Sequence, residues 1–165
     1  MVLLAIDSSK DFMGKLLVSD AFDSFLLQEA NIITSVTHTV NGRIHADFYT
    51  EEERLSHTGE FIPWSEIRPL IFESVKGKNT PLSLRLTLCL KKEAMDALMQ
   101  KKNPEAANTG LRALVINIRF ESGAVAIMTG TSYDSFVLDR SAEEIWDETV
   151  KQFLLSKEIS FTAQN

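Results

Sequence analysis

The chain has 165 residues, of which 44% are hydrophobic and 24% charged, and its formal net charge is -6. This length fits one domain that buries most of its apolar surface, and the composition excludes disordered and fibrous classes. The negative charge excludes a chain that is simply a sink for nucleic acid, although a local basic face remains compatible with it.

Cysteine usage and the distribution of apolar residues predict the compartment. Cys89 is the single cysteine and cannot form an internal disulfide, so we expect a reducing environment. The N-terminus is too short and too soon acidic to act as a signal peptide. No apolar run approaches the roughly 20 residues of a membrane-spanning helix. We therefore expect a soluble, cytoplasmic protein with no membrane partner.

The first 50 residues predict a strand, a helix and a β-hairpin. Alternating apolar residues over 2–6 predict a short strand, and Ser8 with Asp11 predicts the start of a helix. From 25 to 49 the pattern is typical of β structure. Asn41-Gly42 predicts the turn of a hairpin, because both residues tolerate the positive φ of a type I′ turn.

The next segment predicts a helix that carries Trp64. Its entrance is expected at Pro63, where the missing N–H costs little. Pro69 removes a backbone hydrogen bond inside the same helix. It therefore requires either a helix that starts near Ser65 or a kink.

The second half opens with alternate leucines over 82–90, which predict its clearest strand. A helix is expected from Lys92 to about Asn103, followed by a polar loop as far as Gly110. Three further strands are predicted, around 114–120, around Val125 and Ile127, and around Phe136 and Leu138. Ser122-Gly123 predicts the tight turn between the first two of them.

The last helix is predicted from about 141 to 156. Ser141 and Glu144 have the spacing of a capping box. Trp146 lies on its wide apolar face.

The two halves show the same order of elements. Asn41-Gly42 and Ser122-Gly123 are 81 residues apart, and Trp64 and Trp146 are 82 apart. We therefore predict an α+β fold with a mostly antiparallel sheet, built over residues 1–165 as a single domain with an internal pseudo-repeat. The repeats would span about 1–80 and 81–165, as similar β-α-β-β-(β)-α halves related by a pseudo-two-fold axis. The alternative is an undivided α+β domain whose elements merely alternate.

Several short motifs resemble an uncharacterised family of small single-domain bacterial proteins. The resemblance implies no activity. The motifs that carry it are Lys10-Asp11-Phe12-Met13, Asp20-Ala21-Phe22, Lys76-Gly77-Lys78, Thr80-Pro81-Leu82 and Thr129-Gly130-Thr131.

Residues 82–138 are also similar to one repeat of a sliding DNA clamp. The similar segments are 114–118, Glu121-Ser122-Gly123 and 126–131. Clamps often place an acidic residue after such a run, where this chain has Ser132. The resemblance implies a non-enzymatic, clamp-like binding or assembly module in which helices face DNA, and a ring of this kind would need several copies of the chain.

Basic residues concentrate on two helices that the repeat makes equivalent. We hypothesise that these helices present a basic face to DNA phosphates while the acidic segments 51–60 and 139–148 lie elsewhere. The alternative is that the charged residues simply solvate helix surfaces. The candidate nucleic-acid-binding residues are Lys10, Lys15, Lys91, Lys92, Lys101 and Lys102.

The predicted first hairpin also suggests a metal site. A two-residue turn at Asn41-Gly42 would place His38 opposite His45, with Asp47 on the same face. Two histidines and a carboxylate form a known ligand set for iron and other divalent metals. A shift of one residue in the turn would break this pairing, and a polar outer sheet face is the alternative.

No other catalytic motif is found. The chain has no glycine-rich phosphate loop, Cys-x-x-Cys, His-Glu-x-x-His or Gly-x-Ser-x-Gly motif, and we expect no cofactor. Cys89 is interpreted as a core neighbour and His57 as a loop residue. Three functions stay open: a clamp-like module that contacts DNA and assembles as a homo-oligomer, a protein-partner-binding domain with no nucleic-acid role, and a small metal-dependent enzyme that uses His38, His45 and Asp47.

Overall fold

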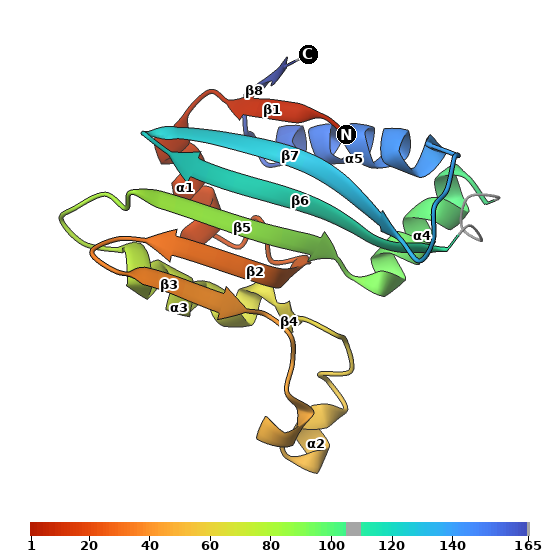
Figure 1. Cartoon of the computed structure of the whole chain (residues 1–165), viewed down its shortest axis with the longest axis horizontal. Coiled ribbons are helices and arrows are strands. Elements are labelled where there is room, and N and C mark those ends of the chain that lie inside the picture. Colours follow the sequence, from red (N-terminus) through yellow and green to blue (C-terminus); the bar gives the residue numbers. More distant parts are fainter. Residues whose placement is uncertain (105–109, 165) are drawn as a thin grey trace.

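The protein is built on one eight-stranded sheet in which every strand pair is antiparallel. The computed structural model describes residues 1–104 and 110–164. Along the sheet the strand order is β3-β2-β5-β6-β7-β1-β8, and β4 pairs with β2 (Figure 1). The strands are β1 (Leu3–Ile6), β2 (Phe25–Ile33), β3 (Thr37–Asn41), β4 (Ile62–Pro63), β5 (Ser83–Leu90), β6 (Leu111–Glu121), β7 (Ala124–Tyr133) and β8 (Phe161–Gln164).

Helices cover one face of this sheet and leave the other open. In Figure 1, α1, α3 and α5 lie behind the sheet, and α4 lies near the ends of β5 and β6. Each of these four helices contributes residues to one hydrophobic core. The helices are α1 (Ser9–Leu17), α2 (Glu51–Arg54), α3 (Trp64–Val75), α4 (Lys92–Lys102) and α5 (Ser141–Ser156), with a 3₁₀ turn at Ala46–Phe48.

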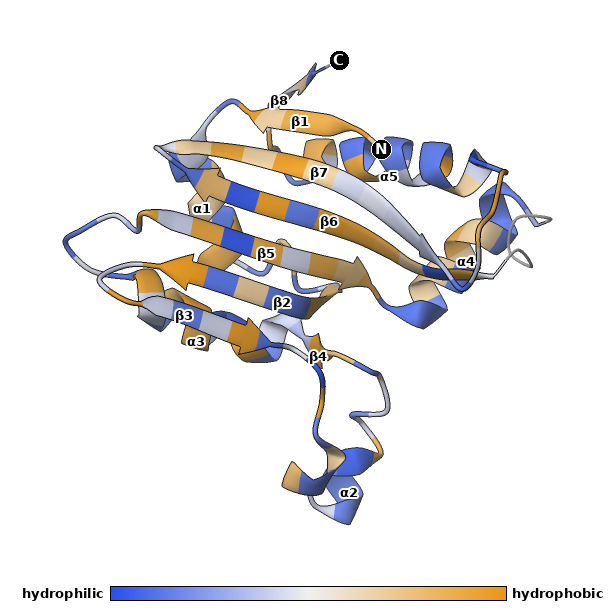
Figure 2. Cartoon of the chain, in the orientation of Figure 1, coloured by the Kyte–Doolittle hydropathy of each residue, from blue (hydrophilic) through white to orange (hydrophobic). Residues whose placement is uncertain are grey.

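Strand β5, which pairs with a strand from each half of the chain, shows the burial that its alternate leucines predict. In β5, Leu84, Leu86 and Leu88 are buried against the helices, whereas Arg85 is exposed on the open face. Figure 2 shows the same alternation along the neighbouring strands β2 and β6. A period of two is what a sheet needs when only one of its faces is covered. The expected α+β class and antiparallel sheet are confirmed.

The first residues of α1 and α3 show how the local sequence determines where each helix begins. Ser8 caps α1, because its hydroxyl accepts a hydrogen bond from the Asp11 N–H at 3.3 Å. Helix α3 begins at Trp64, directly after Pro63, and continues through Pro69. The helix therefore continues despite the backbone hydrogen bond that is lost because Pro69 has no N–H.

The second predicted hairpin is confirmed in detail. Glu121 pairs with Ala124, so Ser122 and Gly123 form a two-residue loop between β6 and β7. Both loop residues have positive φ, 53° at Ser122 and 77° at Gly123. These angles match the twist of the flanking strands, as expected for this class of turn.

The first predicted hairpin is wrong in its register. Strands β2 and β3 are joined at residues 34–36, not at Asn41-Gly42, and His38 pairs with Ile32. Gly42 is instead buried beside β2, where its N–H donates to the Gln28 carbonyl at 2.8 Å. A Cβ at this position would lie 1.8 Å from the Leu27 carbonyl oxygen. Glycine is needed here for close backbone approach, which the sequence cannot distinguish from a turn requirement.

Three smaller expectations near the C-terminal half are corrected. The strand expected around Phe136 and Leu138 is absent; β7 instead runs on to Tyr133, and both side chains are exposed in the following loop. Ser141 does not cap α5, because its N–H and hydroxyl both donate to the Asp139 carboxylate. Strand β8 was not expected. The polar loop expected between 104 and 110 lies largely outside the described residues.

The order of elements repeats, but the strand pairing differs between the halves. β1-α1-β2-β3-α3 corresponds to β5-α4-β6-β7-α5, with the 3₁₀ turn, α2 and β4 added in the first half. Strand β5 lies between β2 and β6, whereas β1 lies between β7 and β8. Trp64 and Trp146 are both buried, yet their indole N–H groups donate hydrogen bonds to different kinds of element. Trp64 donates to α1 and Trp146 donates to β6. Superposition of the halves about a pseudo-two-fold axis stays a prediction.

Candidate functional site

The six candidate lysines do not form one basic face. Lys15 pairs with Asp11 at 3.0 Å and Lys92 pairs with Asp96 at 3.0 Å. Lys91 and Lys92 lie at the start of α4, about 15 Å along the helix from the Lys101-Lys102 end, given a rise of about 1.5 Å per residue. The remaining candidate, Lys10, is exposed on α1.

Acidic side chains are interspersed with basic ones across the helix layer. Helices α1, α3, α4 and α5 carry seven basic and nine acidic side chains, a net charge of -2. Four of the acids lie on α5, which packs against the same sheet face as α1 and α4. The acidic segment 139–148 therefore includes the start of a helix in the same layer, and DNA contact by the lysine-bearing helices stays a prediction. Phosphates approaching this layer would meet both signs of charge.

The residues of the predicted metal site are not brought together. His38 lies in β3 opposite Ile32, His45 precedes the 3₁₀ turn, and Asp47 lies within that turn. Within residues 1–104 and 110–164 no three His, Cys, Asp or Glu side chains are grouped so as to hold a metal ion. The pairing of His38 with His45 fails because the hairpin turn lies seven residues earlier than expected.

Residues 43–61 form a projection that we call the arm. It leaves the sheet after β3 and returns at β4, carrying the 3₁₀ turn and α2 (Figure 1). No side chain of the arm is buried. Phe48 is 84% exposed and Leu55 is 80% exposed. Two large apolar side chains thus face solvent on a segment that has almost no core of its own.

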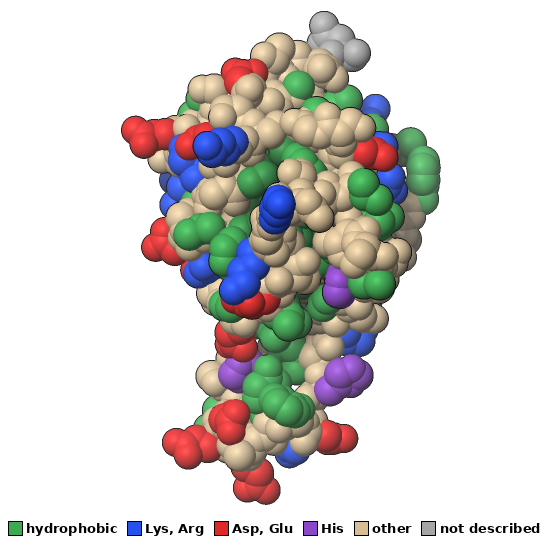
Figure 3. Space-filling view, turned by 90° about the vertical axis from the view of Figure 1, so that its left-hand side faces the viewer, with side chains coloured by type: hydrophobic (Ala, Val, Ile, Leu, Met, Phe, Trp, Pro, Cys, Tyr) green, Lys and Arg blue, Asp and Glu red, His purple; other side chains and the backbone are tan. Residues whose placement is uncertain are grey.

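Acidic residues surround these apolar side chains. The arm holds five acidic and two arginine side chains, a net charge of -3 with neutral histidines. Figure 3 shows acidic side chains around the tip of the projection, with hydrophobic ones among them. The five acidic residues are Asp47, Glu51, Glu52, Glu53 and Glu60.

His57 holds the arm to the helix layer. Its Nε2 lies 2.9 Å from a Glu66 carboxylate oxygen on α3, and its Nδ1 lies 2.8 Å from the Glu53 carbonyl oxygen. The Tyr49 ring stacks on the imidazole with centroids 4.1 Å apart. The Glu53 carbonyl and the Glu66 carboxylate together raise the pKa of His57 above its ordinary value. The interpretation of His57 as a loop residue is confirmed, and its contacts give it an anchoring position.

A second anchor closes the base of the arm. Arg43 and Phe61 form an isolated antiparallel bridge, and the Arg43 guanidinium lies 5.4 Å from the Phe61 ring centroid. Arg43 also pairs with Glu60 at 2.7 Å. These contacts join the two segments of the arm where it leaves and rejoins the sheet.

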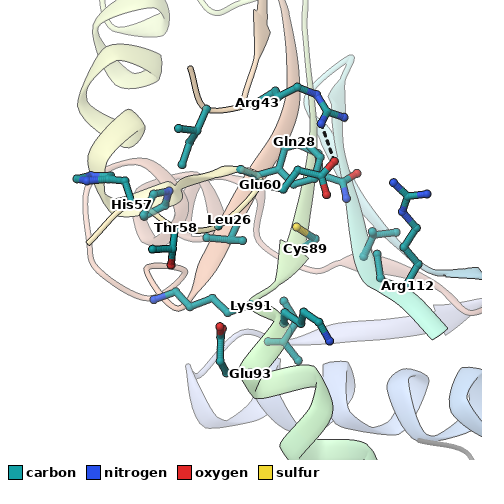
Figure 4. A pocket seen from close by; sticks show the side chains of 18 of the residues that line it. Leu26, Gln28, Arg43, His57, Thr58, Glu60, Cys89, Lys91, Glu93 and Arg112 are labelled. Atoms are coloured by element: carbon teal, nitrogen blue, oxygen red, sulfur yellow. Dashed lines mark ion pairs between the residues drawn. The ribbon is translucent and has the colours of Figure 1, made fainter. Parts of the chain in front are cut away.

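A cleft of about 690 Å³ lies between the base of the arm and the ends of β5 and β6. Figure 4 shows Cys89 between the arm residues Arg43 and Glu60 on one side and Lys91 on the other, with Arg112 beside them. Apolar side chains from several elements also line the cleft: Leu26, Ile44, Phe61, Leu90, Ala113 and Val115.

The net charge of this cleft is positive, whereas that of the whole chain is negative. Its lining includes four basic and two acidic side chains, a net charge of +2, against -6 for the whole protein. Burial raises the pKa of the Cys89 thiol to about 11, so the thiol is neutral at physiological pH. The interpretation of Cys89 as an inert core neighbour agrees with its burial. The basic residues are Arg43, Lys91, Lys92 and Arg112, and the acidic ones are Glu60 and Glu93.

The open face of the sheet forms another hollow, of about 1030 Å³. Arg85 and Arg119 lie directly opposite each other on β5 and β6. The Glu121 carboxylate accepts a hydrogen bond from the Arg119 Nε at 3.0 Å, which lowers the pKa of Glu121. With Glu29 the hollow carries two charges of each sign. Its charge therefore selects no particular ligand.

Sequence reasoning missed the arm and most of the cleft. Lys91 and Lys92 were predicted as nucleic-acid-binding residues, but their proximity to Arg43 and Arg112 depends on strand pairing across the sheet. The exposed Phe48 carried no usable signal, because Ala46 and Ile44 precede it at strand and helix spacing and it fitted the β pattern expected over 25–49.

The fold and its surfaces define a one-sheet α+β protein with a projecting acidic arm and a small basic cleft. The chain matches the model of a family of unknown function (DUF5721) over residues 15–162, and it belongs to this family. No curated protein and no solved structure matches it. Membership in an uncharacterised family is thus confirmed, and the likeness to a sliding clamp stays a prediction. In the described ranges no helix is long and apolar enough to cross a membrane.

Proposed function

We propose that this chain is a non-enzymatic protein-binding module that engages its partner with the arm. The observation that carries the proposal is the exposure of Phe48 and Leu55, both at least 80%, on a projection that contacts the helix layer through His57 and Glu66. Transferring such side chains out of water contributes about 1.5–3 kcal/mol each. Within the chain they gain almost none of this, so a partner surface is where it would be gained.

The charge of the arm indicates what the partner presents. Glu51, Glu52 and Glu53 are exposed at the first turn of α2. A partner with an apolar pocket surrounded by Lys and Arg would complement both features. Association would then be accelerated by electrostatic steering and would weaken with salt.

The anchoring of the arm also favours binding. The His57 contacts and the Arg43–Phe61 bridge hold the arm before any partner arrives. Less conformational entropy is then lost on association, which increases affinity without adding contacts.

A DNA-contacting role is supported less well by the same geometry. The arm has a net charge of -3, and α5 carries four acidic side chains against one basic, so both disfavour phosphates. A metal-dependent enzyme receives no support from the positions of His38, His45 and Asp47.

The test is affinity capture from an extract of the source organism, with the arm varied. We expect the double substitution Phe48→Ser and Leu55→Ser to weaken binding of the captured protein by at least about 30-fold, since a hot-spot side chain contributes at least about 2 kcal/mol. Phe136→Ser with Leu138→Ser is the matched control, because these side chains are 88% and 83% exposed outside the arm. The control should retain binding.

Two results would contradict the proposal. One is a partner that binds the arm variant and the wild type equally well. The other is low-salt DNA binding by the wild type that is lost when Lys10, Lys15, Lys91 and Lys92 become glutamate, which would restore the clamp-like hypothesis.

A further inference from the structure

We infer that the cleft between the arm and the sheet binds an amphipathic organic anion, attracted by Lys91 and Arg112 on its two sides, with its apolar body against the cleft floor. The inference does not depend on the protein-binding role of the arm. A volume of about 690 Å³ falls within the range of small-molecule sites, roughly 300–1,000 Å³.

The basic side chains of the cleft differ in how closely they pair with acidic residues of the protein. Arg43 pairs with Glu60 at 2.7 Å, and Lys92 pairs with Asp96 at 3.0 Å. Arg112 reaches Asp134 only at 4.0 Å, the outer limit of an ion pair.

Lys91 differs from these three basic residues. No ion pair of the described residues involves it. Lys91 and Arg112 therefore have the greatest capacity to bind an external anion.

The start of α4 adds to the positive potential on the same side. Lys91 is the N-cap of this 11-residue helix and makes no side-chain capping bond, while Lys92 and Glu93 of the first turn line the cleft. The N-terminal end of a helix carries a partial positive charge that favours an anion. Glu93 opposes this effect, which leaves the lysine and arginine side chains as the main source of attraction.

The floor of the cleft selects against a purely inorganic ion. Leu26, Leu90 and Val115 contribute apolar surface from three neighbouring strands. Cys89 between them is a neutral thiol because burial raises its pKa to about 11, so it does not repel an anion. A ligand that joins an alkyl or aromatic body to a carboxylate, sulfonate or phosphate satisfies both parts of the cleft.

The probe is 1-anilinonaphthalene-8-sulfonate, an aromatic sulfonate whose fluorescence rises in apolar sites. We expect saturable binding that weakens by at least about 10-fold in Lys91→Gln with Arg112→Gln, a factor that corresponds to the loss of one to two charge-assisted contacts. Lys101→Gln with Lys102→Gln removes the same charge at the far end of α4 and should change the affinity less than about 2-fold. Thermal unfolding of each variant checks that it is folded.

Two further measurements separate the cleft from other surfaces. Phe48→Ser with Leu55→Ser should leave probe binding intact, because the exposed apolar residues of the arm tip are not cleft residues. Octyl phosphate and octanoate should displace the probe and octanol should not, and the more effective of the two anions identifies the preferred acidic group.

The inference is overturned if the probe does not bind saturably, or if the Lys101 and Lys102 variant loses as much affinity as the cleft variant. Displacement by octanol as effective as by the anions would overturn it as well, since the site would then be merely apolar. Loss of probe binding in the arm variant would assign the probe to the arm.

Discussion

The two hairpins of the sheet carry similar turn dipeptides but use them for different purposes. Ser122 and Gly123 adopt positive φ and reverse the chain between β6 and β7. Gly42 has no such backbone angle and lies buried against β2, while the β2–β3 reversal occurs at 34–36. Gly123 is needed for its positive φ, whereas Gly42 is needed because a Cβ would clash with β2. A dipeptide signal alone does not separate these two requirements.

The difference also fixes where the arm begins. The Gly42 N–H donates to Gln28 of β2, and its carbonyl accepts from the Ile62 N–H, both at 2.8 Å. The chain is thus clamped between two strands just before it leaves the sheet. Had Asn41-Gly42 been a hairpin turn, the chain would have continued as a strand and no arm would form.

The largest losses of stability are expected when the two buried tryptophans beneath the sheet are substituted. The Trp146 Nε1–H donates to the Val115 carbonyl of β6 at 2.7 Å, and the Trp64 Nε1–H donates to Leu16 of α1 at 3.2 Å. We expect Trp146→Ala and Trp64→Ala each to lower the free energy of unfolding by about 3–5 kcal/mol. Urea unfolding measures both. Equal losses would support equivalent halves, and a difference above about 2 kcal/mol would argue against them.

Substitution of the two glycines tests the comparison directly. Gly42→Ala should destabilise the protein by about 3 kcal/mol, because a Cβ 1.8 Å from the Leu27 carbonyl oxygen forces β2 and the base of the arm apart. Gly123→Ala should cost about 1 kcal/mol, since its Cβ meets nothing within 4 Å and only the positive φ is unfavourable.

Gly14, inside α1, provides the control for these substitutions. A Cβ there also meets nothing within 4 Å, so Gly14→Ala should stabilise the protein by up to about 1 kcal/mol. The order of effects matters more than their size. A Gly123 variant less stable than the Gly42 variant would reverse our interpretation of both sites.

The smallest effect is expected from the pH dependence of the arm's anchor. The pKa of His57 is raised by the Glu53 carbonyl and by the Glu66 carboxylate. The protonated anchor therefore contributes its stabilisation fully below the unfolded pKa of about 6.5 and loses it as pH rises through the folded pKa. NMR titration of the imidazole should show the raised value, and Glu66→Gln should lower it. Glu73→Gln, on the same helix, should leave it unchanged.

Most elements could be predicted because their signals are local. The leucines of β5, the cap at Ser8 and the turn at Ser122-Gly123 each depend on neighbours within a few residues. Register between strands is not local: moving one turn by seven residues placed His38 opposite Ile32 and removed the proposed metal site. The cleft depends on sheet order as well, which brings Arg43 near Arg112 although 68 residues separate them in sequence.

Strand β1 occupies a position in the sheet that has a consequence for folding during synthesis. Ala5 pairs with Ala126 on one side and with Thr162 on the other. At roughly 5–20 residues per second, a ribosome needs about 6–24 seconds to add the 121 residues that follow Ala5 up to and including Ala126. Throughout that interval the apolar residues of β1 have no strand partner in the nascent chain, whereas β2 gains its partners β3 and β5 once the chain has reached Leu90. Strand β1 is therefore made early but incorporated late, and it is where a chaperone that holds unfolded chains would be needed longest.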